Sequence, residues 1–262
     1  MKSSENLDKI FKFGLSLIEE AEQHIKKNYN KIARIDHKNG HFNLVTNVDK
    51  EVEEIIVRKI KSNFSDHVII AEESGRHNKH SMYEWFIDPI DGTTNFAHGY
   101  PFFCTSIGFA IDDEMVIGLV NNPIRNELFT GRKNKGAYLN KKKIRVSSIK
   151  KLQDALLVTG FPHDKKSSKM KNFNRFKNLT LNSHGVRRDG AAALDLCYVA
   201  CGRVDAFWEE KLSSWDVAAG KVILEEAGGK ITKFSGEKYS VFDKEIIASN
   251  GKIHSEMLKW LK

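Results

Sequence analysis

The sequence predicts a mixed α and β fold, and three observations support this prediction. The chain opens with two amphipathic helical patterns, continues with short apolar segments typical of strands, and then mixes both kinds of element. Of its 262 residues, 40% are hydrophobic and 29% are charged, as in ordinary globular proteins. No repeat, low-complexity tract or proline-rich linker divides the chain. We therefore expect no clean boundary between residues 1–150 and residues 151–262.

Two helices and a run of strands are expected in the first half. Residues 7–29 and 48–62 carry apolar side chains at helical spacing. The second helix has a start signal, because Thr46 and Asp49 have the spacing of a capping box. Apolar segments then predict strands at residues 68–71, 85–88, 105–111, 116–121, 127–132 and 136–139.

Strands and helices alternate in the second half. Strands are expected at residues 155–159, 206–209, 230–233 and 245–249, and helices at about 165–180, 190–201, 214–227 and 251–261. Asp189 is expected to cap the helix at 190–201, which ends at Gly202.

Charge and cysteine usage limit the class of protein. The formal net charge of +8 indicates an anionic partner: nucleic acid, an acidic membrane surface or a phosphorylated metabolite. The lysines are spread along the chain, which argues against a dedicated nucleic-acid stripe. Cys104, Cys197 and Cys201 have no disulfide-like spacing and are expected to be structural thiols in a reducing compartment. Since no membrane span or signal peptide is recognisable, we expect a cytoplasmic protein without a membrane partner.

The most informative segment surrounds Asp88 and Asp91. An apolar strand leads into these aspartates and then into Gly92 and Thr93, which can open a helix. Open α/β layers place ligands at the carboxyl ends of strands, and backbone N–H groups at a helix start point towards anions. Asp-Pro and Asp-Gly are also ordinary turn dipeptides, so this segment alone equally fits a structural turn.

Three further segments place carboxylates at the ends of elements. Glu72 and Glu73 follow an apolar strand, where adjacent glutamates repel each other unless a cation or solvent compensates. Asp49 and Asp216 each lie in a first helical turn, where an aspartate also serves as part of a cap. Together these side chains offer oxygen ligands with no histidine or cysteine, which favours Mg²⁺ or Mn²⁺ over zinc. Two such cations can bind a phosphate and activate a water for in-line attack.

Taken in order, these motifs resemble the inositol monophosphatase family. The matching segments are Asn43–Asp49, Glu72–Ser74, Asp88–Asn95, Val186–Leu196, Gly202–Glu209 and Ser214–Gly220, and the resemblance covers nearly the whole chain. It implies an αβαβα five-layer sandwich, of the type shared with fructose-1,6-bisphosphatase, and a homodimer. It also implies a single catalytic unit, in which residues 1–150 supply most metal ligands and residues 151–262 supply substrate contacts and Asp216.

The resemblance further implies which residues bind the metals. Glu72, Asp88 and the carbonyl oxygen of Ile90 would bind one Mg²⁺. Asp88, Asp91 and Asp216 would bind a second, and a third, weaker Mg²⁺ would lie near Glu72. Mn²⁺ is a possible substitute.

Catalytic and substrate-binding roles follow from the same resemblance. The catalytic residues would be Glu72 with Asp49 and Thr93, the pair that orients the attacking water. The substrate contacts would be Asp91, Gly92 and Thr93 at the phosphate, and Gly190, Ala191, Ala192, Glu209 and Asp216 towards the sugar or cyclitol. Glu73 would support the metal ligands, and Lys38 matches a lysine on the family's mobile flap. Asp189 departs from the family, in which relatives usually carry an uncharged residue there.

The implied activity is Mg²⁺-dependent, lithium-sensitive hydrolysis of inositol monophosphate by an activated water, without a phosphoenzyme. Within the same chemistry, NADP(H), fructose 1,6-bisphosphate and 3′-phosphoadenosine 5′-phosphate are alternative substrates, because Arg187, Arg188 and Lys211 lie near the expected substrate side. An RNA-associated factor is the alternative of another class, supported by the charge of +8 and by a bacterial relative linked to RNA processes. A catalytically dead scaffold is disfavoured, because none of the expected ligands is substituted.

Overall fold

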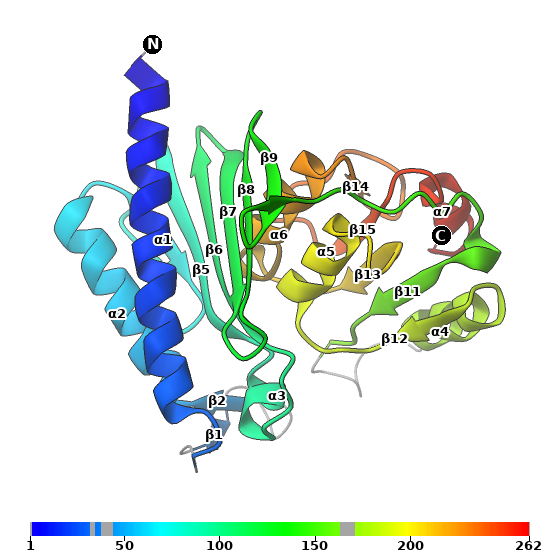
Figure 1. Ribbon diagram of the computed structural model, residues 1–262, viewed down its shortest axis with the longest axis horizontal. Helices are drawn as coiled ribbons and strands as arrows, with labels where there is room; N and C mark the ends of the chain where they lie inside the picture. Colours follow the sequence, from blue (N-terminus) through cyan, green and yellow to red (C-terminus); the bar gives the residue numbers. More distant parts are fainter. Residues whose placement is uncertain (1, 32–34, 38–43, 163–170, 262) are drawn as a thin grey trace.

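The elements of the protein stack in five layers. In the computed structural model, which describes residues 2–31, 35–37, 44–162 and 171–261, two helices cover the outer face of a large sheet (Figure 1). Two more helices lie between this sheet and a smaller one, and another two cover the far side of the smaller sheet. The predicted mixed fold, with αβαβα layers, is confirmed.

The first layer consists of α1 (Lys2–Asn28) and α2 (Asn47–Asn63). Their apolar faces form one continuous core with Trp85 and Phe109 of the large sheet. The predicted capping box is present at the start of α2, where the Thr46 N–H donates to the Asp49 carboxylate over 2.9 Å. In the described part of the chain, no helix has both the length and the apolar character needed to cross a membrane.

The large sheet lies next to these helices and has the strand order β10-β9-β8-β7-β6-β5-β3-β4. Its strands are β3 (Val68–Ala71), β4 (Gly75–His77), β5 (Tyr83–Asp91), β6 (Cys104–Ile111), β7 (Glu114–Asn122), β8 (Glu127–Arg132), β9 (Gly136–Leu139) and β10 (Lys142–Lys143). β3 and β5 run parallel, so their carboxyl ends lie at the same edge of the sheet. A separate pair, β1 (Ile35–His37) and β2 (Leu44–Thr46), precedes α2.

β5 is longer than the sequence indicated, because it continues through Pro89 to Asp91. The pairing with β6 shifts between Asp88 and Asp91, which marks a bulge. A proline is tolerated at a bulge, since its missing N–H is not needed for the ladder there. The Thr105 hydroxyl donates to the Pro89 carbonyl over 2.9 Å and holds the bulge in place. The bulge therefore presents Asp88 and Asp91 from one strand end.

The smaller sheet has the order β12-β11-β13-β15-β14. Its strands are β11 (Leu156–Thr159), β12 (Gly185–Arg187), β13 (Ala206–Glu210), β14 (Lys230–Thr232) and β15 (Glu245–Ser249), preceded by the short helix η1 (Leu152–Asp154). β11 and β13 are parallel. The outer helices α4 (Lys171–Leu181) and α7 (His254–Leu261) pack on this sheet around Trp208 and Met257. The expected start of α4 near residue 165 lies outside the described residues.

The middle layer consists of α5 (Ala192–Ala200) and α6 (Ser214–Glu226). α6 lies close to the large sheet because Gly108, Gly118 and Gly131 face one another across β6, β7 and β8. A Cβ added to Gly118 would lie 2.2 Å from the Ala219 carbonyl oxygen, so no larger residue fits beneath the helix. This close packing fixes the position of α6, whose first turn carries Asp216.

The expected cap of α5 is wrong. The residue at the N-cap is Ala191, which makes no side-chain capping bond, and not Asp189. Gly190, at φ +89°, turns the chain between Asp189 and the helix. The Asn95 side chain also donates to the Asp189 carbonyl over 2.8 Å, which fixes this segment outside the helix.

Candidate active site

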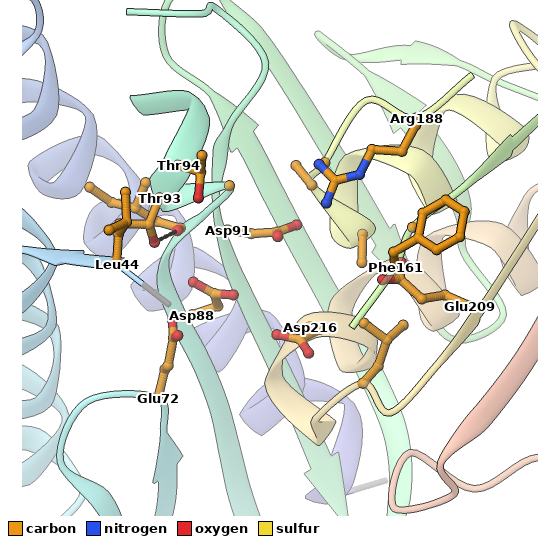
Figure 2. A pocket seen from close by; sticks show the side chains of 17 residues that line it. Leu44, Glu72, Asp88, Asp91, Thr93, Thr94, Phe161, Arg188, Glu209 and Asp216 are labelled. Carbon is orange, nitrogen blue, oxygen red and sulfur yellow. Dashed lines mark hydrogen bonds between the residues drawn. The ribbon is translucent and has the colours of Figure 1, made fainter. Parts of the chain in front are cut away.

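One pocket collects side chains from both sheets and from the middle layer. It is lined by Leu44, Glu72, Asp88, Ile90, Asp91, Gly92, Thr93, Thr94, Gly160, Phe161, Arg188, Gly190, Ala191, Ala192, Glu209, Leu212 and Asp216. Figure 2 shows Glu72, Asp88 and Thr93 on one side and Arg188, Phe161 and Glu209 on the other. Most residues predicted for the site therefore lie together, although they come from distant segments.

The parallel pair β3 and β5 positions the first two acids. The Glu72 N–H donates to the Ile87 carbonyl over 3.2 Å, which places Glu72 beside the end of β5. Asp88 is buried, and within the described residues its Oδ1 has no hydrogen-bond partner. Burial, together with the negative charges of Glu72 and Asp91, raises the pKa of Asp88 well above its ordinary value. A buried carboxylate oxygen without a donor is an expected ligand for a cation.

Asp91 and Asp216 are held by the two helices of the middle layer. The Ala193 N–H at the start of α5 donates to Asp91 Oδ2 over 2.7 Å. The Ser213 N–H donates to Asp216 Oδ2 over 2.7 Å at the start of α6. Burial, and then the negative charge of Asp216, raises the pKa of Asp91 well above its ordinary value. Each carboxylate is thus fixed in place while it repels its neighbour.

These acids fit a hard divalent cation in their chemistry. All predicted side-chain ligands are carboxylates, which together with backbone oxygen suit Mg²⁺ or Mn²⁺. Across the part of the chain that the structure describes, no three acidic, histidine or cysteine side chains are close enough to form a metal cluster by themselves. The assignment of each ligand to a particular ion therefore stays a prediction.

Asp49 lies behind the pocket and reaches it through Thr93. The Thr93 hydroxyl is 3.0 Å from Asp49 Oδ1 and 3.1 Å from the Ile90 carbonyl oxygen, and both oxygens can accept its hydrogen bond. The other carboxylate oxygen of Asp49 accepts hydrogen bonds from the N–H and the hydroxyl of Thr46. Burial raises the pKa of Asp49 to about 6, and the negative charge of Glu72 adds to the effect. Asp49 is thus mostly ionised at neutral pH, and it is a stronger base for proton transfer than an ordinary aspartate.

The turn between β5 and α3 (Thr93–Ala97) requires a glycine. Gly92 has φ +92°, and a Cβ there would lie 3.1 Å from the Phe102 carbonyl oxygen and 3.2 Å from that of Gly190. Asn95 joins the same two segments, since its side-chain amide donates to the carbonyls of Phe102 and Asp189 over 2.6 and 2.8 Å. The turn after β5 and the loop before α5 are therefore held together directly.

Glu209 closes the pocket on the side of the smaller sheet. It is buried near the end of β13, and burial raises its pKa to about 8, with a further contribution from the negative charge of Asp216. A Cβ added to Gly160 would lie 2.1 Å from the Glu209 carboxylate oxygens. Only glycine at position 160 leaves space for this carboxyl group.

Some predicted residues do not line the pocket. Lys38 lies outside the described residues. Glu73 faces a different depression, which is also lined by Lys61 and His77. The role of Glu73 as a support for the metal ligands stays a prediction.

Sequence reasoning missed several residues that shape the site. Glu53 is buried in α2, and its carboxylate accepts the N–H groups of Glu73 and Ser74, each over 2.7 Å. It thereby fixes the turn that carries Glu72. Gly160 and Phe161 follow β11, whose carboxyl end lies beside that of β13. The strand-end rule that located Asp88 could have indicated these two residues.

Comparisons with known proteins agree with this geometry. The model of the inositol monophosphatase family matches residues 6–261. The inositol-1-monophosphatase of Synechocystis sp. is 45% identical over 230 residues, which span 87% of this chain and 80% of that protein. A Nus factor SuhB of Vibrio cholerae is 42% identical over 232 residues, which span 88% of this chain and 87% of that protein.

A solved structure supports the fold. The structure of an inositol monophosphatase from Anabaena (Nostoc) sp. superposes with a TM-score of 0.89 at 40% identity, covering 98% of this chain and 96% of that one. Together with the carboxylate pocket between two sheets, these relationships define a phosphoric monoester hydrolase. The chain belongs to the inositol monophosphatase family.

Proposed function

We propose that the protein is a Mg²⁺-dependent phosphatase that hydrolyses inositol monophosphate to inositol and phosphate. The arrangement that supports this proposal most strongly is the grouping of Asp88, Asp91, Asp216 and Thr93 around one pocket, with Asp49 hydrogen-bonded to Thr93 from behind it. The relative named inositol-1-monophosphatase supports the choice of substrate.

The acidic residues have a direct role in this proposal. Glu72, Asp88 and the Ile90 carbonyl would hold one Mg²⁺, and Asp88, Asp91 and Asp216 a second. When bound, the ions supply positive charge that offsets the repulsion among the acids and stabilises charge on the reacting phosphate. Gly92 and Thr93 would bind the phosphate through backbone N–H groups, which the first turn of a helix leaves unpaired.

Asp49 and Thr93 would accept a proton from the attacking water. The water forms a bond to phosphorus while the bond to the ester oxygen breaks. The water gives its proton to the Thr93 hydroxyl, which passes its own proton to Asp49 Oδ1. A proton from solvent completes the leaving alcohol. No protein side chain becomes phosphorylated in this sequence.

The alcohol portion of the substrate would lie towards the smaller sheet. Glu209, Gly190, Ala191 and Ala192 line that end of the pocket, next to the ring of Phe161. Below pH 8 the neutral Glu209 carboxyl group can both donate and accept hydrogen bonds, which suits a ring of hydroxyl groups.

Phosphate release from a panel of substrates tests this proposal. The panel contains inositol 1-phosphate, fructose 1,6-bisphosphate, 3′-phosphoadenosine 5′-phosphate and NADP(H), each assayed with Mg²⁺, with Mn²⁺ and with EDTA. We expect metal-dependent release with the highest kcat/KM on inositol 1-phosphate, and inhibition by lithium at tens of millimolar. Absence of metal-dependent phosphate release from every compound would refute the phosphatase proposal. A higher kcat/KM on another compound would keep the phosphatase proposal but replace inositol monophosphate as the proposed substrate.

RNA association is a second candidate role, and the net charge of +8 is the observation that favours it. If it is correct, binding to RNA should weaken steeply as salt rises, because phosphate contacts release counterions. No binding at low salt would exclude this role. The expected homodimer can be tested in the same preparation by light scattering.

A further inference from the structure

A groove separate from the active site lies between α1 and the strands β8 and β9. α1 packs on β6 and β7 (Figure 1), and the outer face of the large sheet continues beyond it. Because Phe129 belongs to the core of the middle layer, its neighbours Leu128 and Thr130 point to the outer face. Phe11 and Leu15 of α1 line the groove together with them. Its volume of about 630 Å³ is within the range of small-molecule pockets, about 300–1,000 Å³, and its lining shares no residue with the active-site pocket.

The floor of the groove is apolar and incompletely covered. Phe11, Leu15 and Leu128 pack against the outer core of the large sheet, but each stays half-buried. Tyr138 lines the same groove, and its hydroxyl donates to the Lys135 carbonyl over 3.1 Å. An apolar chain in the groove would remove the remaining exposed surface of these side chains from water, which is favourable in proportion to the area buried.

The charged side chains that line the groove are all basic. They are Arg132, Lys135 and Lys141, and no acid is among the described lining residues. Arg132 forms an ion pair with Asp8 and lies over the ring of Phe11, with its guanidinium carbon 4.8 Å from the ring centroid. Lys135 and Lys141 are exposed, and their side chains form no hydrogen bond or ion pair within the described part of the chain. Two positive charges at the rim are therefore available to an anion.

Lysines at the edge of a sheet also discourage pairing with strands of other chains. This effect accounts for Lys142 and Lys143, which form the edge strand β10. It does not account for Lys135 or Lys141, because they lie in the turns that precede β9 and β10. Lys143 still adds to the positive charge of the groove, since its Nζ would lie 3.7 Å from a Cβ at Gly136, a lining residue.

We propose that the groove binds a free, single-chain carboxylate amphiphile such as a fatty acid. The apolar chain lies along Phe11, Leu15 and Leu128, and the carboxylate accepts charge-assisted hydrogen bonds from Lys135 and Lys141. A nucleic acid would use the lysines but not the aliphatic floor, and a membrane surface would need apolar side chains that protrude instead of lining a hollow. The site does not depend on the proposed phosphatase function.

The probe for this site is dansylundecanoate, whose fluorescence rises in an apolar environment. It is titrated with the purified protein below the concentration at which it forms micelles, in EDTA so that no metal ion in the active-site pocket attracts the carboxylate. Displacement by octanoate, decanoate and dodecanoate measures the contribution of the chain. Decylammonium, which has the chain length of decanoate and the opposite charge, measures the contribution of the head group. Sedimentation with phosphatidylglycerol vesicles tests a lipid surface separately.

Two double variants test the location of the head group. Lys135→Gln with Lys141→Gln removes the two charges at the rim. Lys150→Gln with Lys151→Gln is the matched control, since both lysines are exposed, lie in the following segment of the chain and do not line the groove. Thermal unfolding of each variant checks that it is folded.

We expect the Kd of the carboxylates to fall by about fourfold with each added CH₂ group, because the chain is removed from water. Decylammonium should not displace the probe. Lys135→Gln with Lys141→Gln should weaken the binding of decanoate by about 3- to 20-fold. The control double variant should stay within about twofold of the wild type. These outcomes would support the site.

Several outcomes would overturn it. One is the absence of probe binding, or binding that no carboxylate displaces. Another is equal weakening by the two double variants, which would place the carboxylate elsewhere. Displacement by decylammonium as strong as that by decanoate would indicate a non-specific apolar surface. Binding to phosphatidylglycerol vesicles without binding of the monomeric carboxylates would assign the groove to a lipid surface instead.

Discussion

The hydroxyl group of Thr93 lies 3.0 Å from Asp49 Oδ1, although the two residues are 44 positions apart in the sequence. Asp49 belongs to the outer helix layer and Thr93 to the turn after β5. Thr46 donates hydrogen bonds to Oδ2 of Asp49, and the Thr93 hydroxyl donates to Oδ1. In the proposed mechanism, the pair forms a route for a proton from the pocket to a buried base.

Replacing Thr93 tests this route. Thr93→Ala should lower kcat by about 10²- to 10⁴-fold, because the water loses the hydroxyl that links it to Asp49. Thr93→Ser keeps the hydroxyl and should retain most of the activity. Steady-state phosphate release measures both variants. Activity of Thr93→Ala within about threefold of the wild type would contradict the proposed route.

Glu53 should matter for metal binding although it does not line the pocket. Glu53→Gln replaces one of two acceptor oxygens by an amide group that cannot accept from the backbone N–H of Glu73 or Ser74. We expect a loss of about 1–3 kcal/mol in the free energy of unfolding and a higher Mg²⁺ concentration for half-maximal binding, because the turn carrying Glu72 is released.

Calorimetric titration with Mg²⁺ and thermal unfolding measure the two effects separately. Glu54→Gln is the control, since Glu54 is the exposed neighbour on the same helix. A Glu53→Gln protein with lower stability but unchanged Mg²⁺ affinity would limit Glu53 to a structural role.

The effect of replacing Gly160 on substrate binding should depend on the side chain of Glu209. The Cβ of Gly160→Ala would collide with the Glu209 carboxyl group, so KM should rise by about tenfold or more as that group moves. In a Glu209→Ala background the same change should have little further effect, because the collision partner is gone. A double-mutant cycle on kcat/KM measures the coupling. Additive effects would show that Gly160 acts independently of Glu209.

The Asp88 carboxylate should lower the stability of the protein in EDTA. With Mg²⁺, the same carboxylate should be required for activity and for the stabilisation by the metal. Burial and three neighbouring negative charges raise its pKa, so Asp88→Asn relieves an unfavourable interaction in EDTA and should raise Tm by a few degrees. The same variant should lose activity by more than about 10³-fold and lose the rise in Tm that Mg²⁺ produces in the wild type.

Asp112→Asn removes the same charge at an exposed turn and serves as its control. Differential scanning calorimetry with EDTA and with Mg²⁺ gives six Tm values, two for each of the three proteins. A lower Tm for Asp88→Asn in EDTA would argue that the carboxylate is already well compensated in the metal-free protein.

The fold was predictable where periodicity was strong. The strands at 68–71 and 245–249 have the predicted bounds, because apolar side chains run continuously through them. The extension of β5 past Pro89 was not predictable, since it depends on a bulge held by Thr105 from another strand. The short strand β12 was not predicted, because its three residues carry too little pattern.

The site residues were predictable where an acidic residue lies at the end of a strand or at the start of a helix. Asp88, Asp91 and Asp216 lie at such ends and line the pocket. Glu53 could not be recognised in the same way, because its importance arises from a tertiary contact with the backbone of Glu73 and Ser74. The strand-end rule could have indicated Gly160, but its close approach to the Glu209 carboxyl group has no local signal. Local patterns identify ligands better than the residues that hold them in position.

His254 should make stability depend on pH below neutrality. It is buried between Thr232 and Ser249, whose hydroxyl groups lie 2.9 and 2.8 Å from its ring nitrogens. Burial, assisted by the positive charge of Lys230, lowers its pKa from 6.5 to about 4. Between these values the unfolded chain binds a proton that the folded protein does not. The free energy of unfolding should therefore fall as the pH decreases from about 6.5 to about 4.

The experiment measures denaturant unfolding of the wild type and of His254→Gln in EDTA, at pH 7 and at pH 4.5. The difference in free energy of unfolding between the two proteins isolates the contribution of His254, since all other groups titrate in both. The wild type should be more stable at pH 7, and its advantage should shrink at pH 4.5, because only the wild type must release a proton to fold. An advantage that stays constant over this range would mean that His254 keeps an ordinary pKa in the folded protein.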